Sequence, residues 1–92
     1  MSDEHASLEQ ARINWQLYLT LTQELLKFIN QADIDEFLEL VRQRNIVVDR
    51  MKALPETEVY RQTEECKALV EQIKPLDVQV IYKHMIQLIT EK

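Results

Sequence analysis

The side chains best suited to catalysis or metal binding are widely scattered along this sequence. They include two histidines, His5 and His84, and a single cysteine, Cys66. Neither histidine has a second His or a Cys three or four positions away, the spacing at which one helix presents two ligands to zinc. A nucleophilic cysteine needs a neighbouring base and a lowered pKa, and no base can be named for Cys66. We therefore expect His84 and Cys66 to be packing or surface residues, with no catalytic residue, no metal site and no cofactor.

Three arginines, Arg42, Arg44 and Arg50, fall within one predicted helix, and Arg44 lies on the apolar seam of that helix. Its long side chain can reach solvent over apolar neighbours, pair with an acidic residue of the first or third helix, or bind an anionic ligand. The first role is the commonest for a basic residue in this position. Arg44 is nevertheless the candidate anion-binding residue of the chain.

Composition narrows the class of protein. The chain has 92 residues, 46% of them hydrophobic, and contains no glycine, which opposes tight β-hairpins and rules out glycine-rich phosphate loops. A net charge of −5 without a basic stripe argues against a nucleic-acid partner. The polar N-terminus does not resemble a signal peptide, and no apolar run approaches the roughly 20 residues that span a bilayer. We expect a cytoplasmic protein.

Apolar residues recur every three or four positions, the period of an amphipathic helix. The pattern predicts an all-α protein, a small antiparallel bundle of three to four helices. Residues 1–6 are expected to form a frayed tail and residues 7–92 a single domain. The expected helices span about 7–31, 34–53, 56–73 and 76–91.

The ends of these helices are marked by capping residues and prolines. Ser7 and Gln10 are spaced as a capping box, and Asp33 can cap the second helix while Glu36 reaches back to it. At Lys74-Pro75 the sequence allows two outcomes, since proline in a helix removes a hydrogen bond. The chain either breaks there, with Asp77 as a new cap, or forms one long kinked helix.

The first and last helices carry more apolar residues than one seam requires, among them Leu17 and Tyr82. Exposed apolar patches of more than a few hundred Å² usually mark partner sites. We expect self-association as a dimer, because these apolar residues exceed what a monomer of this size readily buries. We also expect a groove that binds a helix of another protein. The candidate partner-binding residues are Tyr18, Leu21 and Phe28 together with Ile81, Met85 and Leu88.

The first two predicted helices resemble those of the FliT-type flagellar export chaperones. The likeness lies in residues 24–29, the acidic break at 32–33, residues 36–45 and residues 48–51, and it extends over roughly residues 8–73. It implies a cytoplasmic helical chaperone that holds a flagellar subunit, typically the filament cap protein, before type III export. Members of that family end in a further helical tail that helps regulate partner binding, and we expect that tail to be short or absent here.

The last predicted helix is similar to that of the AroQ-type chorismate mutases, through Leu76-Asp77, Ile81 and residues 86–89. Residues 34–36 and the Arg42 to Arg44 stretch also resemble that family. Its chemistry needs cations from several helices to clamp a dicarboxylate and stabilise developing charge. The cations available here match the family's positions loosely or not at all; they are Arg12, Lys27, Lys52 and Arg61. A chorismate mutase is therefore the alternative to the chaperone function.

Overall fold

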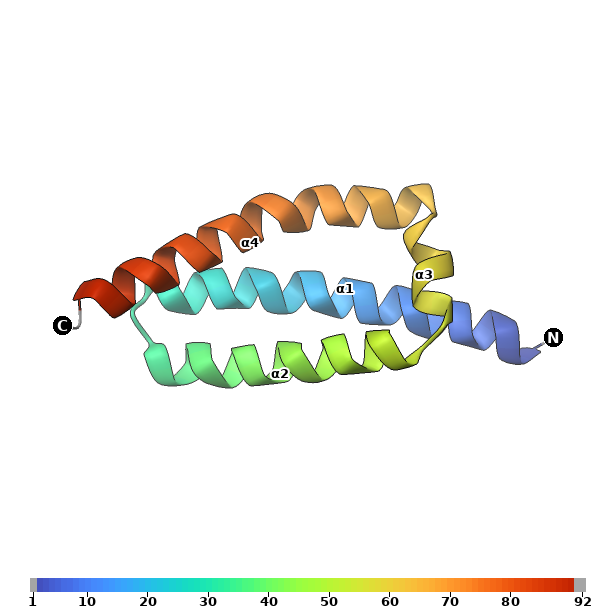
Figure 1. Cartoon of the computed structure of the whole chain (residues 1–92), viewed down its shortest axis with the longest axis horizontal. Coiled ribbons are helices and arrows are strands. Elements are labelled where there is room, and N and C mark those ends of the chain that lie inside the picture. Colours follow the sequence, from blue (N-terminus) through green and yellow to red (C-terminus); the bar gives the residue numbers. More distant parts are fainter. Residues whose placement is uncertain (1, 91–92) are drawn as a thin grey trace.

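The computed structural model describes residues 2–90, with side chains from Ala6 onward, and contains four helices and no strand within that range. The all-α prediction is confirmed. Figure 1 shows α1 between α2 and α4, with α2 antiparallel to α1, α4 parallel to α1, and the short α3 crossing one end. The helices are α1 (Ser2–Asn30), α2 (Ile34–Ala53), α3 (Glu56–Arg61) and α4 (Glu64–Thr90).

The molecule is elongated, measuring 55 × 22 × 16 Å along its principal axes. Both α2 and α4 pack along α1, which is therefore the helix that holds the bundle together. Figure 1 shows the last turns of α4 extending beyond the turn between α1 and α2. An elongated bundle of three long helices leaves much of each outer helix exposed to solvent.

The turn between α1 and α2 contains the only left-handed residue of the described chain, Ala32, with φ of 57°. The Asp33 amide donates to the Phe28 carbonyl at 3.0 Å and the Ala32 amide donates to the Ile29 carbonyl at 3.1 Å. These two hydrogen bonds define a Schellman motif, in which glycine normally occupies the left-handed position. A chain without glycine places alanine there, at a cost in backbone strain.

Asp33 caps α2 as predicted, since its side chain accepts a hydrogen bond from the Glu36 amide at 3.2 Å. The expected return contact from Glu36 is wrong, because the Asp33 amide already donates to Phe28. The predicted bounds of α2, 34–53, are those observed. The bounds of α1 differ, since it begins at Ser2, so Ser7 lies inside the helix and cannot start a capping box.

The chain breaks at Gln62 and Thr63 and not at Pro75, so the predicted helix over 56–73 is wrong. The Thr63 hydroxyl donates to the Tyr60 carbonyl at 2.6 Å and accepts from the Cys66 amide at 3.1 Å, which ends α3 and starts α4. Pro75 lies inside α4, and of the two outcomes left open by the sequence the continuous helix is correct. Figure 1 shows α4 bending along its length toward the α1–α2 turn.

The main core lies where α1 meets α2 and α4, and a smaller one lies under α3. Trp15 packs against both. His84 of α4 contacts the core through the Phe37 ring, with ring centroids 4.8 Å apart, in agreement with a packing role. The buried residues of the main core are Leu21, Leu25, Ile29, Phe37, Leu40, Val47, Met51 and Val80, and those of the smaller one are Ala11, Tyr60 and Cys66.

Replacing Ala32 by glycine is expected to stabilise the protein by about 1 kcal/mol, because glycine adopts a positive φ without steric strain. The matched control is Ala68→Gly at an exposed position in the second turn of α4, which is expected to destabilise the protein by about 1 kcal/mol. Urea denaturation followed by circular dichroism measures both. Destabilisation by Ala32→Gly would contradict the left-handed turn.

Candidate functional site

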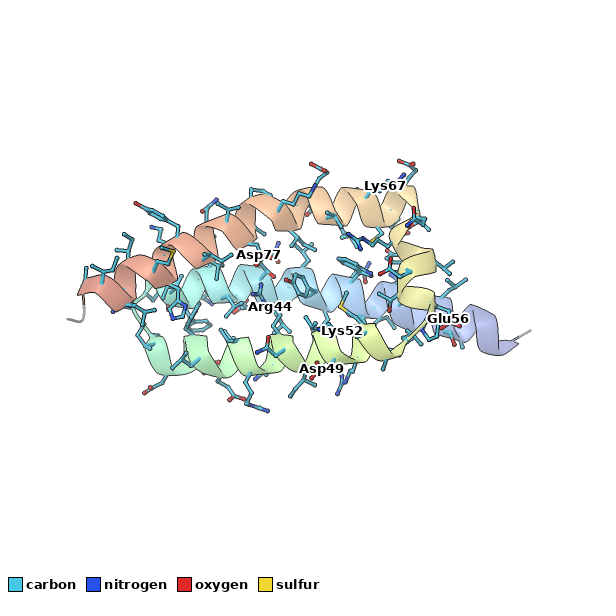
Figure 2. All side chains as sticks on the ribbon, viewed as in Figure 1. Arg44, Asp49, Lys52, Glu56, Lys67 and Asp77 are labelled. Carbon is cyan, nitrogen blue, oxygen red and sulfur yellow. The ribbon has the colours of Figure 1, made fainter. Side chains whose placement is uncertain are left out.

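A polar cluster inside the bundle connects three helices through Arg44. One guanidinium nitrogen, Nη1, lies 2.6 Å from Asp77 Oδ1 of α4 and donates to the Thr22 hydroxyl of α1 at 3.0 Å. The Tyr18 hydroxyl donates to the other Asp77 oxygen at 3.2 Å, and the Tyr18 ring centroid lies 5.0 Å from the guanidinium carbon. Figure 2 shows the labelled Arg44 and Asp77 side chains between α2 and α4.

The charge of Arg44 is already balanced within the cluster, because Asp77 is its counter-ion. The Arg44 side chain is 17% exposed and the Asp77 side chain 28% exposed, so water screens the ion pair only in part. Burial raises the pKa of Tyr18 above its ordinary value, and Asp77 adds to this effect while Arg44 opposes it. Arg44 therefore pairs with an acid of the last helix, and an external anion would have to displace Asp77.

Other side chains that could take part in chemistry make structural contacts instead. Cys66 is fully buried, and burial raises the pKa of its thiol, which is the opposite of what a nucleophile needs. Glu64 lies 3.6 Å from Lys67, and Glu65 accepts a hydrogen bond from the Tyr60 hydroxyl at 2.6 Å. Among the described residues there is no group of three or more His, Cys, Asp or Glu side chains able to hold a metal ion. The His5 side chain lies outside the described side chains.

The six predicted partner-binding residues do not form one surface, because the three on α1 are buried or half-buried and the three on α4 are exposed. Leu21 is 7% exposed and belongs to the main core, and Tyr18 and Phe28 are half-buried against that core. The ammonium group of Lys27 lies 5.2 Å from the centroid of the Phe28 ring and covers it further. The physical reason is that α1 is the shared central helix, so its apolar surplus is used by both neighbours. The prediction of Leu21 as an exposed contact residue is wrong.

The other three predicted residues, Ile81, Met85 and Leu88, are exposed and belong to a larger apolar surface. Six side chains of α4 are between 52% and 67% exposed and recur at helical spacing along one side. The buried positions Ile73 and Val80 lie on the opposite side of the helix. We call the exposed set the outward face of α4; it consists of Val78, Ile81, Tyr82, Met85, Leu88 and Ile89.

The outward face carries no charged side chain of its own. Between residues 76 and 90 the ionisable groups are Asp77, Tyr82, Lys83 and His84, and of these Asp77 and His84 face the bundle. The six side chains expose on the order of 700 Å² together, more than the largest apolar patch of a typical monomer. An uncharged apolar surface of this size is suited to binding another protein.

The described part of α4 does not qualify as a membrane span, and neither do the other helices, because none is both long and apolar enough. Comparison with known proteins gave no match among protein families, curated proteins or solved structures. The choice between functions therefore depends on the geometry of this chain.

Removing one partner of the Arg44–Asp77 pair is expected to destabilise the protein by about 2 kcal/mol, because the other charge stays partly buried. The double variant Arg44→Met/Asp77→Leu is expected to recover most of that loss, since both charges are then gone. Urea denaturation of the two single variants and the double variant gives the coupling free energy.

The control for this cycle is Arg42→Met, which breaks the exposed pair with Glu39 and is expected to leave the stability nearly unchanged, because water screens that pair. Additive effects of Arg44→Met and Asp77→Leu would show that the pair does not hold α4 in place.

Proposed function

We propose that this chain is a helical binding protein that holds an amphipathic helix of another protein on the outward face of α4. The observation that carries the proposal is the row of six exposed apolar side chains on a helix whose other side is already packed. Exposed apolar surface of this extent has no stabilising role in an isolated monomer. A partner that covers it removes that surface from water.

The spacing of the outward face indicates what kind of segment fits it. Val78, Ile81, Met85 and Leu88 follow one another by three, four and three residues, which is the seam of a coiled coil. Helices with this spacing receive the side chains of a partner helix between their own. Met85 and Tyr82 suit such a role, since a thioether repacks readily and an aromatic ring contributes large contact area.

Within this class, the resemblance of residues 8–73 to FliT-type proteins makes a flagellar type III export chaperone the best-supported assignment. The partner would then be a flagellar subunit awaiting export in the cytoplasm, such as the filament cap protein. The outward face would shield an apolar helix of that subunit until it is exported. This assignment is consistent with the all-α fold and the hairpin of α1 and α2.

The same face supports a homodimer when no subunit is bound. A standard protein–protein interface buries about 800 Å² on each partner, close to the area of the outward face. Two copies related by a two-fold axis would place the same six residues against one another. The flagellar subunit and the second copy of this chain would then compete for the outward face of α4.

The alternative chorismate mutase function has less support, because the cations that it would use are engaged elsewhere. Arg12 pairs with Glu9, Arg61 lies 3.7 Å from Glu58, and Arg44 lies 2.6 Å from Asp77. A dicarboxylate site requires such cations to converge on one cavity. These three are instead held by separate carboxylates.

The double variant Ile81→Ser/Met85→Ser is expected to bind the purified filament cap protein at least about tenfold more weakly than the wild type, since two large apolar contacts are lost. Isothermal titration measures the affinity. By sedimentation equilibrium the variant is expected to be monomeric where the wild type dimerises. Both substitutions lie on exposed positions, so the helical circular dichroism should be preserved.

The matched control is Val59→Ser, which removes an equally exposed apolar side chain from α3, away from the outward face. It is expected to leave binding unchanged. Wild-type protein that does not bind the cap protein would contradict the chaperone assignment. Binding that survives the double variant would show that the outward face is not the site.

A further inference from the structure

A second surface lies between α1 and α2, where two clefts share one residue, Arg50. The larger has a volume of about 480 Å³ and is lined by Gln10, Asn14 and Leu54, among others. The smaller, of about 210 Å³, is lined by Leu17 and other residues farther along the same helices. From residue 10 to residue 21 of α1 the two clefts extend about 16 Å, or three helical turns. We call this surface the α1–α2 groove.

The groove does not overlap the outward face of α4 or the Arg44 cluster. Arg50 follows Arg44 by six residues, which places the two side chains about 120° apart around α2. Arg44 contacts α4, whereas the residues around Arg50 in the groove come from α1 and α2 alone. A ligand in the groove would therefore leave α4 uncovered.

Arg50 is unlike every other arginine of the described chain in having no acidic partner. Three of the others pair with a glutamate three residues earlier, and Arg44 pairs with Asp77. The neighbours of Arg50 at three and four positions are all apolar: Ile46, Val47 and Ala53 on α2, and Leu54 directly after it. The side chain is exposed and makes no hydrogen bond or ion pair with the side chains that the structure describes, from Ala6 to Thr90. Arg50 is thus an exposed cation in a groove of apolar and neutral polar side chains, without a counter-ion among the described side chains.

The walls and floor of the groove suit a helix that carries apolar residues. Leu17 of α1 and Ile46 of α2 are 36% and 38% exposed on its two sides. Neutral amides complete the surface: Gln10 donates to the Oδ1 of Asn14 at 3.0 Å, and Asn14 is almost fully buried. Among the described side chains no carboxylate lines either cleft, so none of the lining residues would repel an acidic ligand.

We propose that the α1–α2 groove is a second protein-binding site, whose ligand is an acidic amphipathic helix of about three turns with a carboxylate directed at Arg50. Its apolar side chains cover Leu17 and Ile46, and its carboxylate forms the paired hydrogen bonds that a guanidinium group favours. The length of the groove selects a peptide over a small anion. The single cation selects one carboxylate over a polyanion such as nucleic acid, which needs a basic stripe.

The test uses two synthetic 15-residue helical peptides with the same leucine face, one with glutamate and one with glutamine beside that face. The full-length chain is titrated with each, and fluorescence anisotropy measures the affinities. The Ile81→Ser/Met85→Ser variant serves as the background, so that binding to the outward face of α4 does not contribute. The glutamate peptide is expected to bind about tenfold more tightly than the glutamine peptide.

Substitutions then locate the effect. Arg50→Gln is expected to abolish the preference for glutamate, whereas Arg42→Gln, which removes an arginine already paired with Glu39, preserves it. Ile46→Ser is expected to weaken both peptides equally. Backbone amide shifts are expected to change over residues 10–21 and 43–54. Equal affinities for the two peptides, no binding of either, an unchanged preference in Arg50→Gln, or shifts confined to residues 78–89 would each overturn the proposal.

Discussion

The ion pair between Arg44 and Asp77 determines which side of α4 faces the bundle. Once Asp77 is directed at α2 and α1, the geometry of the helix places Val80 and His84 inward and Ile81 and Met85 outward. Turning α4 about its axis would bury part of the outward face, but it would leave Arg44 in the core without a counter-ion. Tyr18 and Thr22 of α1 bond to the same pair, so the constraint connects all three long helices.

The exposed apolar face is thus a consequence of how few helices the described residues 2–90 form. α1 is covered by α2 on one side and α4 on another, and most of its apolar side chains are buried there. α4 packs along α1 but has no further helix to cover its opposite side. The row of six strongly exposed apolar side chains therefore lies on the C-terminal half of α4, and the α1–α2 groove is a more polar surface on another side.

The sequence predicts the α1–α2 hairpin well and the second half of the chain less well. The bounds of α2 are marked locally, by Asp33 at one end and Leu54-Pro55 at the other. The break at Gln62 and Thr63 lacks such a mark, because the apolar spacing continues through it, although Thr63 followed by two glutamates is a usable capping signal. The sequence predicts that α4 has a surplus of apolar residues, but it does not predict which side of the helix faces solvent. Periodicity cannot orient a helix that is apolar on two sides. That direction depends on Asp77 and Arg44, which lie 33 residues apart.

The central claim, that another protein covers the outward face of α4, is tested most directly by photo-crosslinking in the source cells. A benzoylphenylalanine at position 82 lies on the face, and one at Gln72 lies on an exposed part of the same helix outside it. The account predicts adducts of discrete mass from position 82, containing a flagellar subunit or a second copy of this chain, and none from position 72. Adducts from both positions alike, or from neither, would contradict it.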